Sequence, residues 1–228
     1  MRLALLLCIL LPSPLYCQTE IWNGASFEHE VTESYGYDFV IEYRRAADDF
    51  SDGQYVFTLG TNFKLAEKFS IAPAGRLYVN RGDFNEFRLM TDLNYERQLI
   101  GPFSLEGRLR LQHDRPLGAD GALRQTAIRP RGTLLAKVRD NLDLFAEYEA
   151  RFRFDTRNEW SRNRYTTGIE WRLTSRVALD AYYRIEDDIN EGPRERTRIF
   201  GLYALYVLPD PRERKWDYRR PFGRSFLF

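Results

Sequence analysis

The residues from Leu142 to Arg153 read LDLFAEYEARFR, and apolar and charged side chains alternate along almost the whole stretch. In an extended chain, Leu144 and Tyr148 share one face, while Glu147 and Glu149 share the other. A period of two residues is that of a β-strand, whereas a helix repeats every 3.6 residues. The stretch therefore predicts a strand with one apolar and one charged face.

The same alternation recurs from one end of the chain to the other, and helical periodicity is almost absent. At about 10–14 residues each, the predicted strands exceed the usual 5–6 residues of soluble proteins and match the tilted spans of a membrane barrel. We predict an all-β fold, an antiparallel up-and-down transmembrane β-barrel of about 10–12 strands, with twelve as the best estimate. The strands are expected near 20–30, 35–45, 54–64, 68–79, 85–98, 102–113, 126–139, 142–154, 161–174, 176–186 and 195–208, and 214–228 is the candidate for a twelfth.

The N-terminus has a different character. Arg2 supplies a positive charge, and the apolar run from Leu3 to Leu11 ends at Pro12. This pattern is typical of a secretory signal peptide and is too short to span a bilayer as a helix. We expect cleavage near Cys17 or Gln18. Lipidation of Cys17 is disfavoured, because Tyr16 stands where a lipoprotein signal has a small residue. The predicted organisation is 1–18 as signal peptide, 19–208 as β-barrel and 209–228 as a last strand or a C-terminal tail.

Composition excludes several classes of protein. Both cysteines, Cys8 and Cys17, lie inside or at the edge of the predicted signal peptide, which argues against disulfides and cysteine-ligated metals in the mature chain. Without Arg2, 33 of the 34 basic residues remain against 33 acidic ones, so electrostatic binding of nucleic acid has no support. No apolar run after the signal approaches the roughly 20 residues of a membrane helix.

Connections between the predicted strands alternate in length. Brief turns such as 65–67, 100–102, 140–141 and 174–175 separate longer polar loops at 46–53, 80–83, 115–123, 155–159 and 187–194. Short periplasmic turns and longer outer loops are typical of outer-membrane barrels. The first connection, 31–34, is short, however, although a periplasmic N-terminus would require a long outer loop there. Either the first strand is not an ordinary barrel strand, or the outer loops of a twelve-stranded barrel are unusually short.

Alternation alone does not say which face points inward, because a soluble lipocalin-like barrel has the same period with its apolar face inside. The export signal, the strand length, the strand number and the abundance of Tyr and Phe favour lipid outside. We then expect a lumen of mixed charge, in which opposite charges on neighbouring strands pair. The residues expected to line it are Glu106, Arg108, Arg110, Glu147, Glu149, Arg151, Arg153, Arg162, Arg164, Glu170, Asp180 and Arg184.

These patterns predict location and role together. We expect a bacterial outer-membrane protein, exported by its signal peptide, whose partners are membrane lipid, the barrel-assembly machinery and small solutes, and which uses no cofactor. The lumen indicates a structural role or a narrow passive pore, whose arginine-rich wall would favour small anions. Two other classes stay open: an outer-membrane enzyme acting on lipid or lipopolysaccharide, and a soluble periplasmic carrier.

Support for catalysis or metal binding is slight. The only histidines are His29 and His113, at strand ends, and no serine is spaced to pair with either. The loop acids at 48–49, 52 and 187–188 do not have the spacing of a calcium loop. We therefore predict no catalytic residue and no metal ligand.

The C-terminal residues carry an assembly signal of their own. Gly223, Phe226 and Phe228 have the glycine and alternating aromatic spacing of the bacterial barrel-assembly signal. Pro221 departs from it, because proline lacks a ladder donor. The segment 201–206 is the competing candidate for the last strand, in which case the residues after Pro209 would form a tail.

Short motifs along the chain resemble those of an uncharacterised family of bacterial barrels, domain of unknown function 2490. The resemblance implies a barrel fold without an assigned activity, and members of that family usually end at the strand corresponding to 199–208. The matching features are Trp22, Arg129-Pro130-Arg131, Tyr148-Glu149, Trp160 before Arg162-Asn163-Arg164, Gly168-Ile169-Glu170-Trp171 and Asp180-Ala181-Tyr182-Tyr183.

Overall fold

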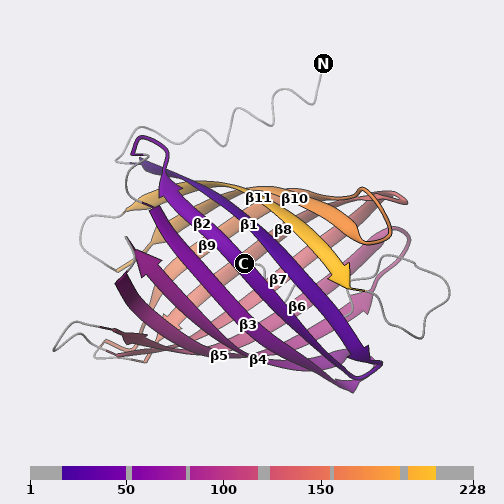
Figure 1. Cartoon of the computed structure of the whole chain (residues 1–228), viewed down its shortest axis with the longest axis horizontal. Helices are drawn as coiled ribbons and strands as arrows, with labels where there is room; N and C mark the ends of the chain where they lie inside the picture. Colours follow the sequence, from indigo (N-terminus) through magenta and orange to yellow (C-terminus); the bar gives the residue numbers. More distant parts are fainter. Residues whose placement is uncertain are drawn as a thin grey trace.

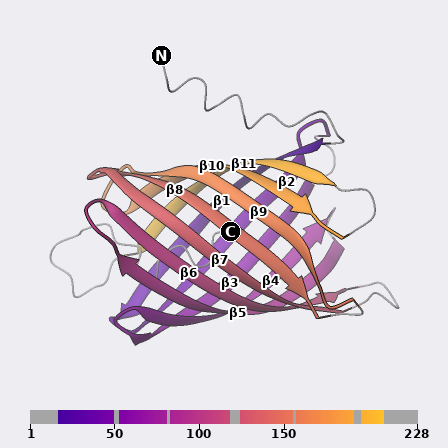
Figure 2. The same ribbon diagram turned by 180° about the vertical axis from the view of Figure 1, so that it is seen from behind.

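The computed structural model describes residues 17–49, 53–80, 83–117, 124–154, 157–190 and 195–208. Within these residues, eleven strands close into one barrel, shown from opposite sides in Figures 1 and 2. The strands are β1 (Cys17–Thr32), β2 (Tyr35–Ala46), β3 (Gly53–Ala66), β4 (Phe69–Asn80), β5 (Asp83–Gln98), β6 (Phe103–Pro116), β7 (Gln125–Arg139), β8 (Leu142–Arg153), β9 (Glu159–Arg172), β10 (Val177–Asp188) and β11 (Arg196–Leu208). The predicted all-β barrel is confirmed. Among the described residues, no helix is long and apolar enough to cross a membrane.

The ring closes between β1 and β11, which lie side by side and run in the same direction (Figure 1). All other neighbouring strands are antiparallel. The predicted antiparallel arrangement is confirmed for these ten pairs, and the seam is parallel because an up-and-down ring with an odd number of strands must contain one parallel pair. Eleven strands fall within the predicted range and are one fewer than the best estimate.

Parallel closure also explains the short first connection. β1 is an ordinary strand of the ring, and it begins at the end of the barrel that carries the longer connections. Its connection to β2 therefore lies at the opposite end, where the connections are short, and β11 also finishes there. The predicted signal peptide up to residue 16, the twelfth strand at 214–228 and the assembly signal from Gly223 to Phe228 lie outside the described residues. The competing segment, 201–206, lies in β11, the last described strand.

The two ends of the barrel differ in their connections, as predicted. At the end that we call the turn end, the strands are joined by 33–34, 67–68, 99–102, 140–141 and 173–176. The turn at 99–102 contains Gly101 with a φ of 66°, a left-handed conformation that favours glycine. At the other end, called the loop end, the connections are 47–52, 81–82, 117–124, 154–158 and 189–195.

Apolar side chains cover the outside of the wall, and charged ones fill the inside. In β6, Leu109 is 45% exposed, whereas its neighbours Arg108 and Arg110 are 4% and 0% exposed. The same division follows the two-residue period around the ring, for example in the outward Leu59 of β3 and the buried Asp92 of β5. This orientation is the opposite of that in a soluble barrel, which keeps its apolar face inside.

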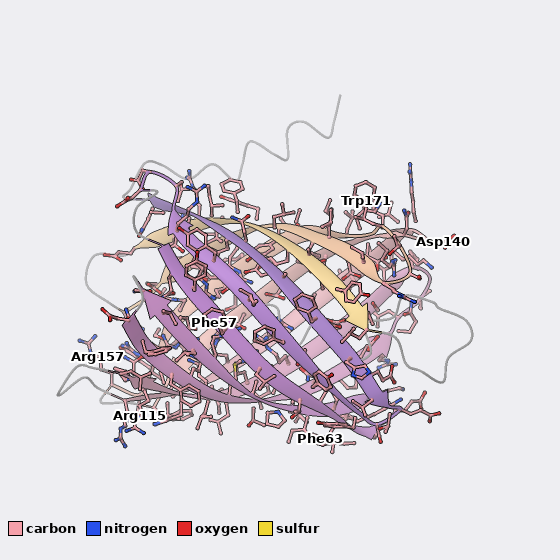
Figure 3. All side chains as sticks on the ribbon, viewed as in Figure 1. Phe57, Phe63, Arg115, Asp140, Arg157 and Trp171 are labelled. Carbon is pink, nitrogen blue, oxygen red and sulfur yellow. The ribbon has the colours of Figure 1, made fainter. Side chains whose placement is uncertain are left out.

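Aromatic rings gather near both ends of the outer wall. Tyr43 and Tyr55 meet near the loop end with ring centroids 4.9 Å apart, and Phe69 and Tyr95 meet near the turn end at 5.1 Å. In Figure 3, Trp171 points away from the barrel near the turn end. Leucines such as Leu109 occupy the wall between the two bands. Interfacial aromatic bands around an aliphatic belt are typical of barrels that cross a bilayer.

Candidate functional site

The lumen is held together by ion pairs that the strand register places opposite one another. One rung runs from Arg108 in β6 through Arg131, Glu149 and Arg164 to Glu186 in β10. Each of these positions lies on the inner face of its strand, and the register places Glu149 between Arg131 and Arg164 and places Glu186 beside Arg164. We call the paired charges on this inner face the lumen network.

Glu149 is the centre of the lumen network. Its Oε1 accepts hydrogen bonds from Arg129 Nε at 3.0 Å and from Arg164 Nη1 at 3.2 Å. Its Oε2 accepts a further bond from Arg108. Glu149 is 2% exposed, so its carboxylate has lost its hydration shell, and the three guanidinium groups take the place of that water.

A second buried pair lies in β5 and β6. Arg110 Nε and Nη2 each donate to a separate oxygen of Asp92 at 2.7 Å, which makes the pair bidentate. Both residues are 0% exposed. This geometry is the strongest form of a guanidinium–carboxylate contact, and it sits where no water reaches either partner.

All twelve residues that the sequence predicted for the lumen lie on the inner face of the wall. Several are brought into direct contact: Glu147 with Arg131 at 3.3 Å and with Arg184 at 3.6 Å, and Arg164 with Glu186 at 2.7 Å. Near the loop end, Arg151 reaches Asp114 at 3.4 Å, Arg153 reaches Glu159 at 2.7 Å, and Arg162 reaches Glu186 at 3.0 Å. Glu106 is half-buried, and Glu170 and Asp180 are buried.

The sequence-based list omitted several members of the lumen network. Asp92 has the same parity as residues that the alternation assigned to the charged face. Arg129 and Arg131 flank Pro130, and their spacing of two carries the same signal. Glu186 follows Arg184 by the same step. Extending the period through these positions would have found all four.

Aromatic residues fill the part of the lumen next to the seam, which the sequence did not predict. Trp22, Tyr182 and Tyr203 belong to one buried cluster. Tyr203 lies opposite Gly24 across the parallel seam, and its hydroxyl donates to Glu42. A Cβ on Gly24 would lie 2.5 Å from the Tyr203 ring, so glycine is required for the ring to lie against the strand.

A polar vestibule opens at the loop end of the lumen, with a volume of about 570 Å³. Arg44 stacks on the Trp22 ring, with its guanidinium carbon 3.8 Å from the ring centroid. Trp22 Nε1 donates to Glu20 at 2.7 Å. Arg162 and Arg164 of β9 also line the vestibule. The vestibule therefore combines several guanidinium groups with one aromatic face.

Neither histidine is part of the lumen. His113 lies in β6, where its Nδ1 is 2.9 Å from Thr126 Oγ1, on an apolar groove of the outer wall. His29 packs edge-on against Tyr37 at 5.1 Å. The hydroxyl beside His113 is therefore a threonine directly opposite in register, a partner that sequence spacing could not reveal.

The acidic residues considered for calcium do not form a cluster of their own. Asp188 pairs with Arg162, and Asp187 is buried and lies 3.7 Å from Arg196. Asp49 lines the vestibule, and Asp52 lies outside the described residues. Within the described part of the chain, no group of three or more His, Cys, Asp or Glu side chains is placed to hold a metal ion.

Comparison with solved structures gives neighbours of low sequence identity. LpxR from Salmonella typhimurium is 9% identical with a TM-score of 0.48, and the match covers 75% of this chain and 83% of LpxR. The outer-membrane expressed OmpT of Vibrio cholerae is 11% identical with a TM-score of 0.39, over 68% of this chain and 54% of OmpT. No curated protein matches the sequence. The family model described as "Protein of unknown function (DUF2490)" matches residues 19–195, and the chain belongs to that family.

Proposed function

We propose that this protein is an outer-membrane β-barrel with a structural role, and that its lumen is sealed rather than open as a passive pore. The observation that carries the proposal is the burial of inward side chains around the entire ring. Each of the eleven strands contributes at least one that is no more than 4% exposed: Ser26, Val40, Thr58, Ala72, Asp92, Arg110, Ala127, Phe145, Thr166, Asp180 and Tyr203.

A water-filled path would leave the side chains along its wall accessible to water. Here the ion pairs of the lumen network fill one part of the cross-section, and the cluster around Trp22 and Tyr203 fills another. Ions would have to displace charges such as Asp92 and Arg110 from their partners, which costs several kcal/mol per buried group. The lumen network thus acts as a polar core that holds the strands together.

Placement in the membrane is supported by the outer wall. Its aliphatic belt lies between two aromatic bands, and its strands are 12–16 residues long. We expect the protein in the outer-membrane fraction, where membrane lipid covers the wall and the barrel-assembly machinery inserts it. Fractionation combined with heat-modifiable gel mobility tests this placement, because folded membrane barrels migrate differently before and after boiling. Recovery in the soluble periplasmic fraction would contradict it.

Single-channel recording in planar bilayers tests the sealed lumen. The wild-type protein should be silent, and Glu149→Ala, which releases three arginines from their shared partner, should produce current. Leu109→Ala, on the outer wall of β6, is the matched control and should remain silent. A steady wild-type conductance that changes in Arg108→Glu would overturn the structural proposal in favour of a pore.

The vestibule supports a second candidate function, the capture of small anionic solutes at the loop end. Arg44, Arg162 and Arg164 face the cavity, and guanidinium groups suit carboxylate and phosphate oxygens. Calorimetric titration with inorganic phosphate should show binding that weakens in Arg162→Gln and is unchanged in Arg115→Gln, which alters an arginine at the same end of the barrel (Figure 3). Equal binding by both variants would exclude the vestibule.

A further inference from the structure

A groove of about 610 Å³ hollows the outer wall across β3 to β7, and we call it the outer groove. β3, β4, β5 and β6 each line it with two outward residues on either side of one inward residue, which places it on the outer face. Its middle is shallow because the side chains there are small. Pro73 lies opposite Thr91, and Thr91 lies opposite Leu111. Gly75, two residues after Pro73, adds no side chain at all.

Above the outer groove, two adjacent strands change from apolar to polar to charged toward the loop end. The outward side chains follow the same order on both strands: Leu111, His113 and Arg115 in β6, and Ile128, Thr126 and Arg124 in and just before β7. The register places the apolar pair and the neutral polar pair directly opposite one another. Successive outward residues are about 7 Å apart along a strand. A phospholipid has the same order of groups, from acyl chain through ester to phosphate.

The aromatic band near the loop end is interrupted at this place. Tyr43 pairs with Tyr55 on β2 and β3, and Phe152 contacts Trp160 on β8 and β9 with ring centroids 5.3 Å apart. Near the same end of β6 and β7, the opposed pair consists of a histidine and a threonine instead. The chain therefore places a hydrogen-bonding pair where other strands place rings.

The polar groups above the groove are able to receive a ligand. Arg115 points away from the barrel at the loop end (Figure 3), and Arg124 is also exposed. Neither forms an ion pair with another described residue. His113 Nδ1 is 2.9 Å from Thr126 Oγ1, so one ring nitrogen is occupied and Nε2 remains for a further partner.

We propose that the outer groove, with His113, Arg115 and Arg124 above it, binds one anionic phospholipid of the surrounding membrane. Guanidinium groups suit phosphate oxygens, and two of them give the site a positive charge that complements a negatively charged headgroup. Bound there, the lipid would place its phosphate by the arginines, an ester carbonyl by His113 Nε2 and an acyl chain along the groove.

Charge also argues against a second copy of the barrel as the occupant. The two-fold axis of a dimer in a membrane runs along the membrane normal, so the same face of each copy would meet at the same depth. Arg115 and Arg124 of one copy would then approach the same arginines of the other, and like charges repel. A lipid phosphate has the opposite sign and avoids this repulsion.

This inference rests on the placement of the wall in a membrane and is independent of the sealed lumen and of the vestibule. Inorganic phosphate does not test the site, because it has no acyl chain to bury in the groove and exposed charges alone contribute little. The roles of the two regions therefore separate: Arg162 belongs to the vestibule, and Arg115 belongs to the lipid site.

Native mass spectrometry of the full-length mature barrel in detergent, with equal amounts of phosphatidylglycerol and phosphatidylcholine, tests the proposal. The wild type should retain one phosphatidylglycerol with at least a tenfold preference. The double variant Arg115→Gln/Arg124→Gln should lose that preference, and Arg115→Lys/Arg124→Lys should keep most of it. Arg139→Gln is the matched control, because Arg139 is an exposed arginine at the turn end of β7, and its preference should equal that of the wild type.

A second substitution tests the groove itself. Thr91→Phe should lower retention of phosphatidylglycerol about tenfold by filling the hollow beside Leu111. Thr167→Phe makes the same change on the outer face of β9, away from the groove, and should have no effect. Heat-modifiable gel mobility verifies that each variant is folded.

Four results would overturn the proposal. They are equal retention of the two lipids by the wild type, unchanged retention in the double glutamine variant, an equal loss in Arg139→Gln, and a wild-type dimer that Thr91→Phe converts to a monomer. The last result would assign the groove to a second copy of the chain. Recovery of the protein in the soluble fraction would instead refute the membrane placement, so the two failures are distinguishable.

Discussion

Replacing Asp92 by asparagine should be among the most damaging single changes in the lumen. The substitution keeps the size of the side chain and removes its charge, which leaves Arg110 buried without its anion. The pair is bidentate, with two bonds of 2.7 Å, and neither residue is exposed to water. At an effective dielectric constant of about 20 and a charge separation of about 3.5 Å, the attraction amounts to about 5 kcal/mol. Breaking a buried pair from one side typically costs about 3–5 kcal/mol.

The reverse substitution, Arg110→Met, should cost less. Asp92 would retain a second positive neighbour, because Arg108 Nη1 lies 3.9 Å from its Oδ2. The double variant should be less destabilised than the sum of the two single variants by at least about 2 kcal/mol, because it leaves neither charge stranded.

Urea unfolding in detergent micelles, followed by heat-modifiable gel mobility, measures these differences. Asp140→Asn is the control, because its ion pair with Lys137 is exposed and its loss should leave stability unchanged within error. The reasoning would be refuted if Asp92→Asn unfolded at the same urea concentration as Asp140→Asn. Strict additivity of the double variant would equally show that the two charges do not interact as the structure implies.

Three further changes test other parts of the barrel. Gly168→Ala should destabilise the barrel by about 1–3 kcal/mol in the same urea assay, because the new Cβ would lie 2.5 Å from the carbonyl oxygen of Ala181. Gly132→Ala is the control and should leave stability unchanged, because nothing lies within 4 Å of its Cβ. Equal effects of the two substitutions would contradict this packing. Leu109→Arg, in the middle of β6, should lower the folding stability in bilayers by about 2–4 kcal/mol, whereas Leu105→Arg, nearer the turn end, should lower it by about 1 kcal/mol or less. Equal losses of stability would argue against a membrane around the wall. His113→Ala should leave fatty-acid release from phospholipid at background, as in the wild type, and a wild-type activity lost in this variant would establish the hydrolase alternative instead.

The sequence by itself determined the strands and the face each residue takes. Along LDLFAEYEARFR, a side chain can only point to one face or the other, so the two-residue period already separates Tyr148 from Glu149. The outward direction of the apolar face followed from strand length and number, since a wide ring cannot be filled by one row of leucines. The two-residue period also assigns Asp92 and Arg129 to the inner face, although neither was among the residues predicted to line the lumen.

Tertiary structure alone decided how the ring closes and what the inner charges do. The choice between eleven and twelve strands depends on whether β1 meets β11, and that contact joins residues nearly 180 positions apart, such as Trp22 and Gly201. No local period encodes such a pairing. The sharing of Glu149 by Arg108, Arg129 and Arg164, and the pairing of His113 with Thr126, likewise depend on register between strands. Parity assigns a side chain to the lumen, but only the stagger of neighbouring strands determines which opposite charge it meets there.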